Sequence, residues 1–306
     1  MKILFFVVQL SVLVLLAPLV SGIVRKIKSN LRMRQGPGVL QPYYNLIKLF
    51  KKEEVISVNT SWIFRVAPYV VLVSSVLALM LVPVFVSDIS LNYMGDFLLI
   101  IFILALGRFF LALAGLDAGS SFGGMGSSRE MFISSFVEPV VVMVIFVVAL
   151  NAHSTDLQVI SAVPALSLPS IIAATAMMFV IIAETSRIPV DNQETHLELT
   201  MVHEAMVLEY SGCSLALIEL AAHVKQIVFF SLIASVILPF GIARDIAPMP
   251  LLVSFTYYGF KIIALATVIS VIEISIAKMR LFRVIDFLNI AFVLSVLGVV
   301  ILAMGK

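Results

Sequence analysis

Ionisable side chains stand inside the strongly apolar stretches of this chain, where they could hold and pass protons. A charge at the centre of a bilayer costs roughly 2.5–3.5 kcal/mol, so each of these residues needs a physical reason for its place. Proton movement requires groups whose burial and neighbours bring their pKa values near the working pH. The groups in question are Glu130, Glu138, Glu184, Glu219, His223, Lys225, Lys261 and Glu273, with Arg108 and Asp117 beside them.

Spacing along predicted helices relates some of these residues to one another. Glu130 and Glu138 lie about two turns apart on one helix, which predicts that they share a face. Glu219 and His223 form an i, i+4 pair, with Lys225 on the neighbouring face. A single such residue is more simply explained as a structural ion pair or a side chain that reaches the interface. Acids in several spans, accompanied by Lys and His, favour a proton path over a cation channel lined by acids alone.

The densest polar segment is RIPVDNQETHLELTMVHEAMVLEYSG at 187–212, directly after an apolar run. Asp191 and Glu194 have the spacing of a capping box, which predicts a helix that starts at Asp191. On that helix Glu194, Glu198 and Glu209 would fall within about 60° of one another. The segment can be interpreted as a solvated amphipathic helix on the membrane surface, or as an acidic funnel that leads to Glu184. We favour the funnel.

Metal and redox centres are not expected in this chain. His203 and Glu204 lack the second histidine of a zinc-binding HExxH helix. Cys213 is the one cysteine, which excludes an intrachain disulfide and an iron–sulfur cluster with cysteine ligands from this chain alone. If redox chemistry matters to the function, partner proteins must carry its cofactors.

Composition places these residues in a membrane protein. The chain of 306 residues is 61% hydrophobic and 12% charged, with a mean hydropathy of +1.15, whereas soluble domains are about half apolar and a quarter charged. Roughly 20 apolar helical residues cross a bilayer core. The first apolar run could serve as a signal peptide, but its length favours a retained helix. We predict one all-α membrane domain over 1–306, with eight spans at about 3–24, 66–87, 97–115, 130–150, 166–186, 215–240, 250–275 and 284–304.

Basic residues gather in the loops on one side of the predicted bundle. These loops are the long connections 25–65, 115–130 and 187–214, and the short loop between the last two spans. The positive-inside rule therefore predicts that these loops are cytoplasmic and that both termini lie outside. Within the first loop, YYNLIKLFKK predicts an amphipathic helix. It could lie on anionic headgroups or dock a soluble partner, and the two roles are compatible.

Three stretches of the chain resemble the subunit-1 (NuoH-like) family of respiratory complex I. AETSRIPVDNQETHLE followed by LEYSG is similar to that family's AETNRxPFD loop, its spaced glutamates and its Glu-Tyr pair. RMRQGPGVLQPYYNLIKLFKKEE resembles the segment after the family's first helix, with its arginine, Gly-Pro, Leu-Gln and Lys-Leu. GSSREMFISSFVEP resembles the family's Arg-Glu helix. The resemblance covers nearly the whole chain.

Departures from the quinone-reducing members of that family point to a particular branch. The Gly-Pro segment is shorter, and Asn45 stands where an Asp is expected. Val190 replaces the Phe of PFD, and His196 occupies one acidic position. These features look more like the membrane subunit of energy-converting nickel–iron hydrogenases, including the formate hydrogenlyase and hydrogenase-4 types. They argue against a working quinone pocket.

The resemblance implies a non-catalytic subunit that anchors a peripheral redox arm and couples its electron transfer to translocation of protons or sodium ions. Its place would be the cytoplasmic membrane of a bacterium or archaeon. The implied partners are hydrogenase large and small subunits, iron–sulfur subunits, antiporter-like membrane subunits and the lipid bilayer, without nucleic acid; the nickel–iron centre and iron–sulfur clusters would lie in those partners. The implied coupling residues are Glu130, Glu138, Glu184, Arg187, Asp191, Glu194, Glu198, Glu209, Glu219, His223, Lys225, Lys261 and Glu273. The implied docking residues are Arg32, Arg34, Gln35, Gly36, Pro37 and Lys48.

Two other functions stay open from the sequence. With the same fold, the chain could be the quinone-binding membrane subunit of an NADH:quinone oxidoreductase. It could instead be a stand-alone proton-coupled solute carrier, in which Arg108 or Lys261 binds an anionic substrate. Partner subunits that contain nickel and iron–sulfur clusters would separate a hydrogenase from a carrier, and dependence on added quinone would identify the oxidoreductase.

Overall fold

Helices build the part of the chain that the structure, a computed structural model, describes. These residues are 2–57, 59–86, 96–162, 167–191, 201–243, 247–277, 279 and 281–304, and within them no strand is longer than an isolated bridge. The helices there are α1 (Lys2–Leu31), α2 (Gln41–Phe50), α3 (Trp62–Leu81), α4 (Phe97–Asp117), α5 (Ser121–Ala152), α6 (Leu157–Ala162), α7 (Leu168–Glu184), α8 (His203–Val207), α9 (Gly212–Leu232) with its π-helical continuation η1 (Ile233–Ile237), α10 (Pro248–Ser275) and α11 (Leu281–Met304).

Eight of these helices correspond to the eight predicted spans. Seven are long and apolar enough to cross a membrane: α1, α3, α4, α5, α9 with η1, α10 and α11. The eighth, α7, is equally apolar but has 17 residues, near the lower limit for a spanning helix. The prediction of an all-α polytopic membrane protein is confirmed.

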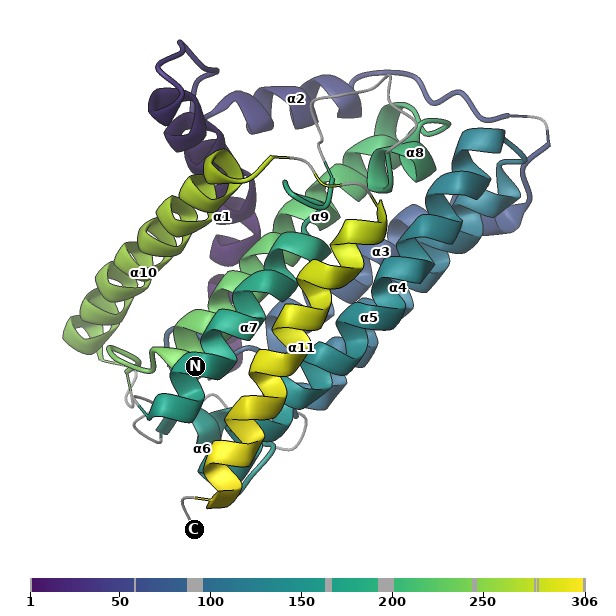
Figure 1. The fold of residues 1–306 in the computed structure, drawn as a ribbon. Helices are drawn as coiled ribbons and strands as arrows, with labels where there is room; N and C mark the ends of the chain where they lie inside the picture. Colours follow the sequence, from purple (N-terminus) through teal and green to yellow (C-terminus); the bar gives the residue numbers. More distant parts are fainter. Residues whose placement is uncertain are drawn as a thin grey trace.

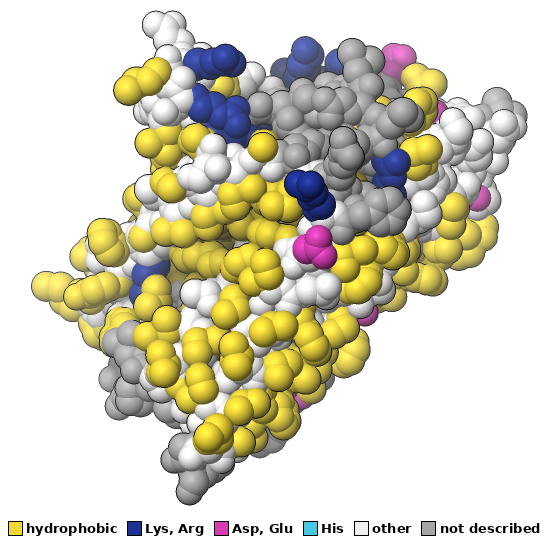
Figure 2. Space-filling model, in the orientation of Figure 1, with side chains coloured by type: hydrophobic (Ala, Val, Ile, Leu, Met, Phe, Trp, Pro, Cys, Tyr) yellow, Lys and Arg dark blue, Asp and Glu magenta, His cyan; other side chains and the backbone are white. Residues whose placement is uncertain are grey.

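The long helices run side by side, and α2 and α8 lie across one end of the bundle (Figure 1). α3 packs between α4 and α9, α11 packs on α7 and α5, and α1 packs on α9 and α10. The end that carries α2 and α8 also carries the C-terminal ends of α1 and α10 and the start of α9. We call it the basic end, because Lys and Arg side chains gather there while apolar side chains cover the flank below (Figure 2).

The predicted cytoplasmic loop 115–130 is mostly helix. α4 continues to Asp117 and α5 begins at Ser121, so the connection shrinks to residues 118–120. The Ser120 hydroxyl caps α5 by accepting the Gly123 N–H at 3.1 Å. The stretch GSSFGGMGSS looked like a loop because glycine and serine disfavour helices, but small residues also allow close packing. At Gly126 a side chain would press on Ala205 and Met206 of α8 and on the carbonyl oxygen of Val202 just before it, so the small residue allows that contact.

Candidate functional site

A cavity of about 700 Å³, lined by many ionisable side chains among apolar ones, lies inside the basic end of the bundle. It extends from the exposed segment 32–37 to the buried ends of α7 and α9, with further walls from α1, α3, α4, α5, α8 and α10. Most of the ionisable residues singled out in the sequence line this one cavity: Glu130, Glu184, Arg187, Asp191, Glu219, His223, Lys225 and Glu273. Tertiary structure therefore brings together groups that are far apart along the chain.

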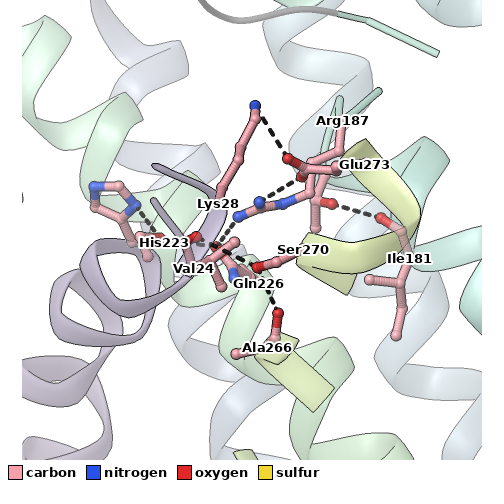
Figure 3. A network of polar contacts seen from close by, with 11 residues as sticks. Val24, Lys28, Ile181, Arg187, His223, Gln226, Ala266, Ser270 and Glu273 are labelled. Carbon is pink, nitrogen blue, oxygen red and sulfur yellow. Dashed lines mark hydrogen bonds and ion pairs between the residues drawn. The ribbon is translucent and has the colours of Figure 1, made fainter. Parts of the chain in front are cut away.

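Glu273 is the centre of one ion-pair network at this cavity (Figure 3). Its carboxylate lies 2.7 Å from the guanidinium of Arg187 and 3.1 Å from the ammonium of Lys28. Only 2% of the Glu273 side chain is exposed, so the two cations offset the cost of burying its charge. Because Lys28 belongs to α1, Arg187 follows α7 and Glu273 belongs to α10, the network ties three helices together.

Gln226 and His223 extend the network along α9. Arg187 donates to the Gln226 side-chain oxygen at 2.9 Å, and the Ser21 hydroxyl of α1 donates to the same oxygen at 2.8 Å. The Ser21 hydroxyl also lies 2.8 Å from Nδ1 of His223. The sequence paired His223 with Glu219, four residues earlier on α9. The structure instead places the imidazole against α1, because helices from elsewhere in the chain compete with local spacing.

Glu184 is the centre of a second network. Its Oε1 lies 2.6 Å from the Arg108 guanidinium, and its Oε2 lies 2.7 Å from the Lys225 ammonium. Arg108 also lies 3.5 Å from the carboxylate of Glu138. Arg108 and Glu184 are both buried, so this network places charge at the junction of α4, α5, α7 and α9.

The C-terminal end of α7 directs Glu184 and Arg187 into different networks. Ser186 has a φ of 50°, in the left-handed region. The Arg187 N–H donates to the Ile182 carbonyl at 3.0 Å, and the Ser186 N–H donates to the Ala183 carbonyl at 3.1 Å. This pair of bonds is the Schellman pattern, which ends a helix with a sharp turn of the chain. Glu184 therefore contacts α4 and α9, whereas Arg187 contacts α9 and α10.

Asp191 binds the start of α8. Its Oδ2 accepts the backbone N–H groups of Val202 and His203 at 3.0 and 3.2 Å. A buried carboxylate at this place satisfies amides that the first turn of a helix leaves without partners. Residues 192–200 lie outside the described residues, and they include Glu194 and Glu198. The predicted capping box and acidic stripe therefore stay predictions.

The Glu-Tyr pair after α8 divides between surface and core. Glu209 is exposed and lies outside the lining of the cavity. Tyr210 stacks on Phe64 of α3 with ring centroids 4.0 Å apart, and its hydroxyl donates to the Phe64 carbonyl at 2.9 Å. Burial raises the pKa of Tyr210, so the phenol stays neutral and holds the segment against α3.

Glu130 and Glu138 do not share a face. Eight residues at 100° each offset their side chains by about 80° around α5. Glu130 lines the cavity, whereas Glu138 lines a second pocket of about 350 Å³ between α4 and α5. The Glu138 side chain is 49% exposed there. The expectation of one shared face was wrong because two turns of an α-helix fall short of eight residues, and the difference turns Glu138 away from the cavity.

Lys261 also lies outside the large cavity. Its ammonium donates to the carbonyl oxygens of Ala234 at 3.0 Å and Phe240 at 2.5 Å, and to that of Leu238. These carbonyls belong to η1 and the residues just after it, where helix carbonyls lack their own donors. Lys261 and Glu273 lie about 18 Å apart along α10. The described contacts of Lys261 are those of a helix cap.

The predicted docking residues surround the mouth of the cavity. Arg32, Arg34, Gln35 and Pro37 are exposed or partly exposed, as is Gly36, and all five line the cavity. Lys48 is exposed on α2, outside the lining. The predicted amphipathic helix is confirmed as α2, in which Pro42 and Leu46 are buried. Its docking role stays a prediction.

Sequence reasoning missed three residues of the site. Lys28 looked like one base among many in a basic loop, although it continues α1 and reaches Glu273. Ser21 and Gln226 gave no signal, because single polar residues are common in apolar helices. Arg108 stood out as an intramembrane charge but had no place on the expected path. Only the packing of α1 and α4 against their neighbouring helices shows what these residues contact.

The two networks alternate acids and bases over a short space. The bases are Lys28, Arg108, Arg187 and Lys225, and the acids are Glu138, Glu184 and Glu273. Each acid meets one or two cations, so a change of charge on one group alters the pairing of the next. An arrangement of this kind can relay a charge change from the cavity mouth into the membrane. The fold and site together define a polytopic α-helical membrane protein with an ionisable interior.

Comparison with known proteins gives the family. The family model described as NADH dehydrogenase (NADHdh) matches residues 2–303. The chain is 36% identical to "Hydrogenase-4 component C" of Escherichia coli over 282 residues, 91% of this chain and 89% of that protein. It is 32% identical to "Formate hydrogenlyase subunit 4" of Escherichia coli, over 92% of each chain. The chain therefore belongs to the NADH dehydrogenase family of NuoH-like membrane proteins, on its hydrogenase branch.

More distant matches extend to a relative of lower identity and to a solved structure. A membrane-protein relative from Rhodospirillum rubrum, named as a subunit of NADH-quinone oxidoreductase, is 25% identical over 84% of this chain and 80% of that protein. A chain in the "Structure of the membrane-bound sulfane sulfur reductase (MBS), an archaeal respiratory membrane complex" superposes with a TM-score of 0.86 at 17% identity. The match covers 98% of this chain and 99% of that chain, which supports the fold.

Proposed function

We propose that this protein is the membrane subunit of a multisubunit membrane-bound nickel–iron hydrogenase of the hydrogenase-4 or formate hydrogenlyase type. In this role it anchors a peripheral redox arm and couples electron transfer in that arm to translocation of protons or sodium ions. The nickel–iron centre and the iron–sulfur clusters belong to partner subunits, among them the hydrogenase large and small subunits. Antiporter-like membrane subunits are the further partners.

The observation that carries the proposal is the cavity that joins the exposed rim 32–37 to the buried carboxylates Glu184 and Glu273. A partner seated on the rim would stand at the mouth of an ionisable interior. A change in the charge of that partner would then alter the energies of the buried ion pairs. Coulomb interactions between such pairs are strong because the protein interior has a low dielectric constant. Two relatives are more than 30% identical to this chain, and both are named as parts of hydrogen-metabolising systems. They support assignment to the hydrogenase branch of the family.

The location follows from the same reasoning. The protein is embedded in the membrane as a multi-pass chain. We place it in the cytoplasmic membrane of a bacterium or archaeon, with the basic end on the cytoplasmic side, because positively charged loops are retained there. Peripheral subunits would then meet the cavity from the cytoplasm.

Purification tests the assembly. The tagged chain, extracted in mild detergent, is expected to bring down subunits that contain nickel, iron and acid-labile sulfide. A chain that purifies alone and moves a solute in liposomes would overturn the proposal and support the carrier.

Vesicle measurements test the coupling. Inverted membrane vesicles given a reduced viologen dye are expected to evolve hydrogen and accumulate the coupled ion. Glu138→Gln and Glu198→Gln are each expected to abolish ion accumulation while hydrogen evolution and subunit composition persist, with exposed Glu53→Gln as the matched control. If both variants accumulate the ion normally, the acidic funnel does not take part in coupling.

The quinone-binding role remains the second candidate, because a 700 Å³ cavity is large enough for a small organic ligand and quinone oxidoreductase subunits are among the relatives. Turnover that requires added quinone and stops with a quinone-site inhibitor would establish it over the hydrogenase. The departures at Asn45 and Val190 favour the hydrogenase.

A further inference from the structure

The first hydrogen bond between Arg187 and its neighbours on α9 has a direction that the groups themselves determine. A guanidinium has N–H donors and no acceptor, so the Gln226 atom that lies 2.9 Å from Arg187 must be the amide oxygen. The amide nitrogen of Gln226 is buried without a hydrogen-bond partner, so the contact with Arg187 is what fixes the orientation of the amide. Glu273 accepts from the other terminal nitrogen of Arg187 at 2.7 Å, which keeps the guanidinium in place.

The directions of the next two hydrogen bonds follow from the first. The Gln226 side-chain oxygen can only accept, so the Ser21 hydroxyl at 2.8 Å must donate its hydrogen to it. A hydroxyl has one hydrogen, and Ser21 therefore has none left for Nδ1 of His223, which is also 2.8 Å away. The Ser21 oxygen must accept from that nitrogen, so Nδ1 carries a hydrogen. The network thus assigns the tautomer of His223.

The second ring nitrogen of His223, Nε2, points away from this network (Figure 3). His223 lines the 700 Å³ cavity, and within the described residues the hydrogen bond of its ring is the one made by Nδ1. The charges that act on the ring come from Arg25 of α1 and from Arg187, and neither side chain can accept a proton. When the ring is neutral, Nε2 therefore offers a lone pair to a donor in the cavity.

The three hydrogen bonds cannot pass a proton from one end of the network to the other. His223 donates to Ser21, and Ser21 donates to Gln226. Arg187 donates to the same Gln226 oxygen from the opposite end. A proton moves along such a chain only if each member can accept from one neighbour and donate to the next, and an amide oxygen has no hydrogen to donate. Ser21 and Gln226 are therefore positioning residues.

We propose that the chain of hydrogen bonds from Arg187 holds His223 in its Nδ1–H tautomer, so that the ring gains and loses a proton only at Nε2, on the side of the cavity. The neutral ring accepts a hydrogen bond from water or from a ligand hydroxyl group, and it offers no donor to a ligand carbonyl oxygen. In ion coupling, His223 would exchange its proton with the cavity and not through α1. That use rests on the proposed function, whereas the tautomer is a property of this chain.

Nitrogen NMR tests the tautomer in the purified protein, together with any subunits that accompany it, after labelling of its histidines with a nitrogen isotope. The difference between the wild type and His223→Gln isolates the signals of this ring. At about pH 8, above the ordinary histidine pKa of about 6.5, ring nitrogens with and without hydrogen give separate signals. The wild type is expected to carry hydrogen on Nδ1 and none on Nε2.

Two substitutions remove the cause of this tautomer and leave the ring in place. Gln226→Leu removes the acceptor of the Ser21 hydrogen, so the hydroxyl can donate to Nδ1 and the ring hydrogen should move to Nε2. Ser21→Ala removes the acceptor of Nδ1–H and should likewise move the hydrogen to Nε2. Ser21→Thr keeps a hydroxyl and should retain the wild-type tautomer. Ser11→Ala, at an exposed serine of α1, is the matched control.

A wild-type ring without hydrogen on Nδ1, or with hydrogen on Nε2, would overturn the inference, as would the wild-type tautomer in Gln226→Leu or Ser21→Ala. Packing alone would not move a hydrogen between the two ring nitrogens. If Gln226→Leu does not accumulate in the membrane, Ser21→Ala and Ser21→Thr carry the test. These spectra require no turnover, so vesicles that fail to accumulate ions would refute the proposed function and leave this result unaffected.

Discussion

At the scale of single residues, the interior of this protein is a set of charges that depend on one another. Glu273 illustrates the point, because it is almost fully buried and holds two cations from other elements. Removing one member of a buried pair usually costs more than the pair contributes, since the remaining charge has lost both water and its partner. The networks therefore specify how α1, α7 and α10 meet, beyond any contribution to proton transfer.

Glu273→Gln should lower the free energy of unfolding by roughly 3–5 kcal/mol, the range seen when a buried pair is broken. Arg187 and Lys28 would then lose the carboxylate that both contact at this buried site. Thermal unfolding of the detergent-solubilised protein measures the change. Glu53→Gln removes an exposed acid and should have little effect, and an unchanged midpoint for Glu273→Gln would show that water compensates the two cations.

At the scale of helices, a close backbone contact and the ammonium group of Lys261 determine how neighbouring elements are joined. α10 packs mainly on α1, and Lys261 adds a link from α10 to η1 and the residues after it. α1 in turn meets the segment before α2 at Gly22, where any side chain would clash with the carbonyl oxygen of Val39. The Lys261 contacts and the Gly22–Val39 contact therefore join elements by interactions other than the hydrogen bonds within each helix.

Lys261→Met keeps the length of the side chain and removes its ammonium. We expect a loss of about 2–3 kcal/mol, because hydrogen bonds to a charged group are worth more than neutral ones and buried carbonyls would lose their donor. Hydrogen exchange should become faster at 233–240, the end of the helix that Lys261 caps. The exposed Lys51→Met after α2 is the control, and equal exchange in both variants would contradict the capping role.

Gly22→Leu should displace the segment 36–42 from α1, because the added side chain meets backbone atoms that cannot yield by rotation alone. Hydrogen exchange over 36–42 is expected to rise while α5 and α11 keep their protection. Gly259→Leu is a matched change in another membrane helix, at a site where no atom stands within 4 Å of an added Cβ. If the two variants behave alike, the α1 contact does not hold this segment.

At the scale of the whole molecule, polarity is arranged along the bundle axis. Apolar side chains cover the flank, and the bases and the cavity mouth share one end (Figure 2). Arg32 and Arg34 stand exposed at that mouth. A partner with an acidic surface would be guided to this end, and the attraction would weaken with salt because exposed charges are screened beyond about 10 Å at 0.1 M.

Arg32→Glu/Arg34→Glu should release the peripheral subunits from the membrane at a lower salt concentration than the wild type requires. Washed membranes, tested for nickel and hydrogenase activity at increasing salt, provide the measurement. Arg65→Glu/Arg283→Glu changes the net charge equally at two exposed positions away from the cavity and should retain the arm. Equal retention in both double variants would move the docking surface elsewhere.

The sequence by itself determined the fold class, the approximate positions of the eight apolar helices and the existence of α2. These follow from hydropathy and helical periodicity, which depend on neighbouring residues in the sequence and can be read without knowledge of the tertiary structure. The sequence also identified most of the ionisable side chains that line the cavity, because a charge in an apolar run is rare enough to be noticed. It placed the start of α5 too late, since glycine and serine signal loops unless a neighbouring helix selects them for close packing.

Tertiary structure alone decided which charges meet. Local spacing suggested that His223 pairs with Glu219 and that Glu130 and Glu138 share a face, yet the partners come from helices distant in sequence. Ser21, Lys28 and Gln226 joined the site for the same reason. An ion pair depends on distance through space, and only the packing of α1, α4, α7, α9 and α10 around one cavity sets those distances.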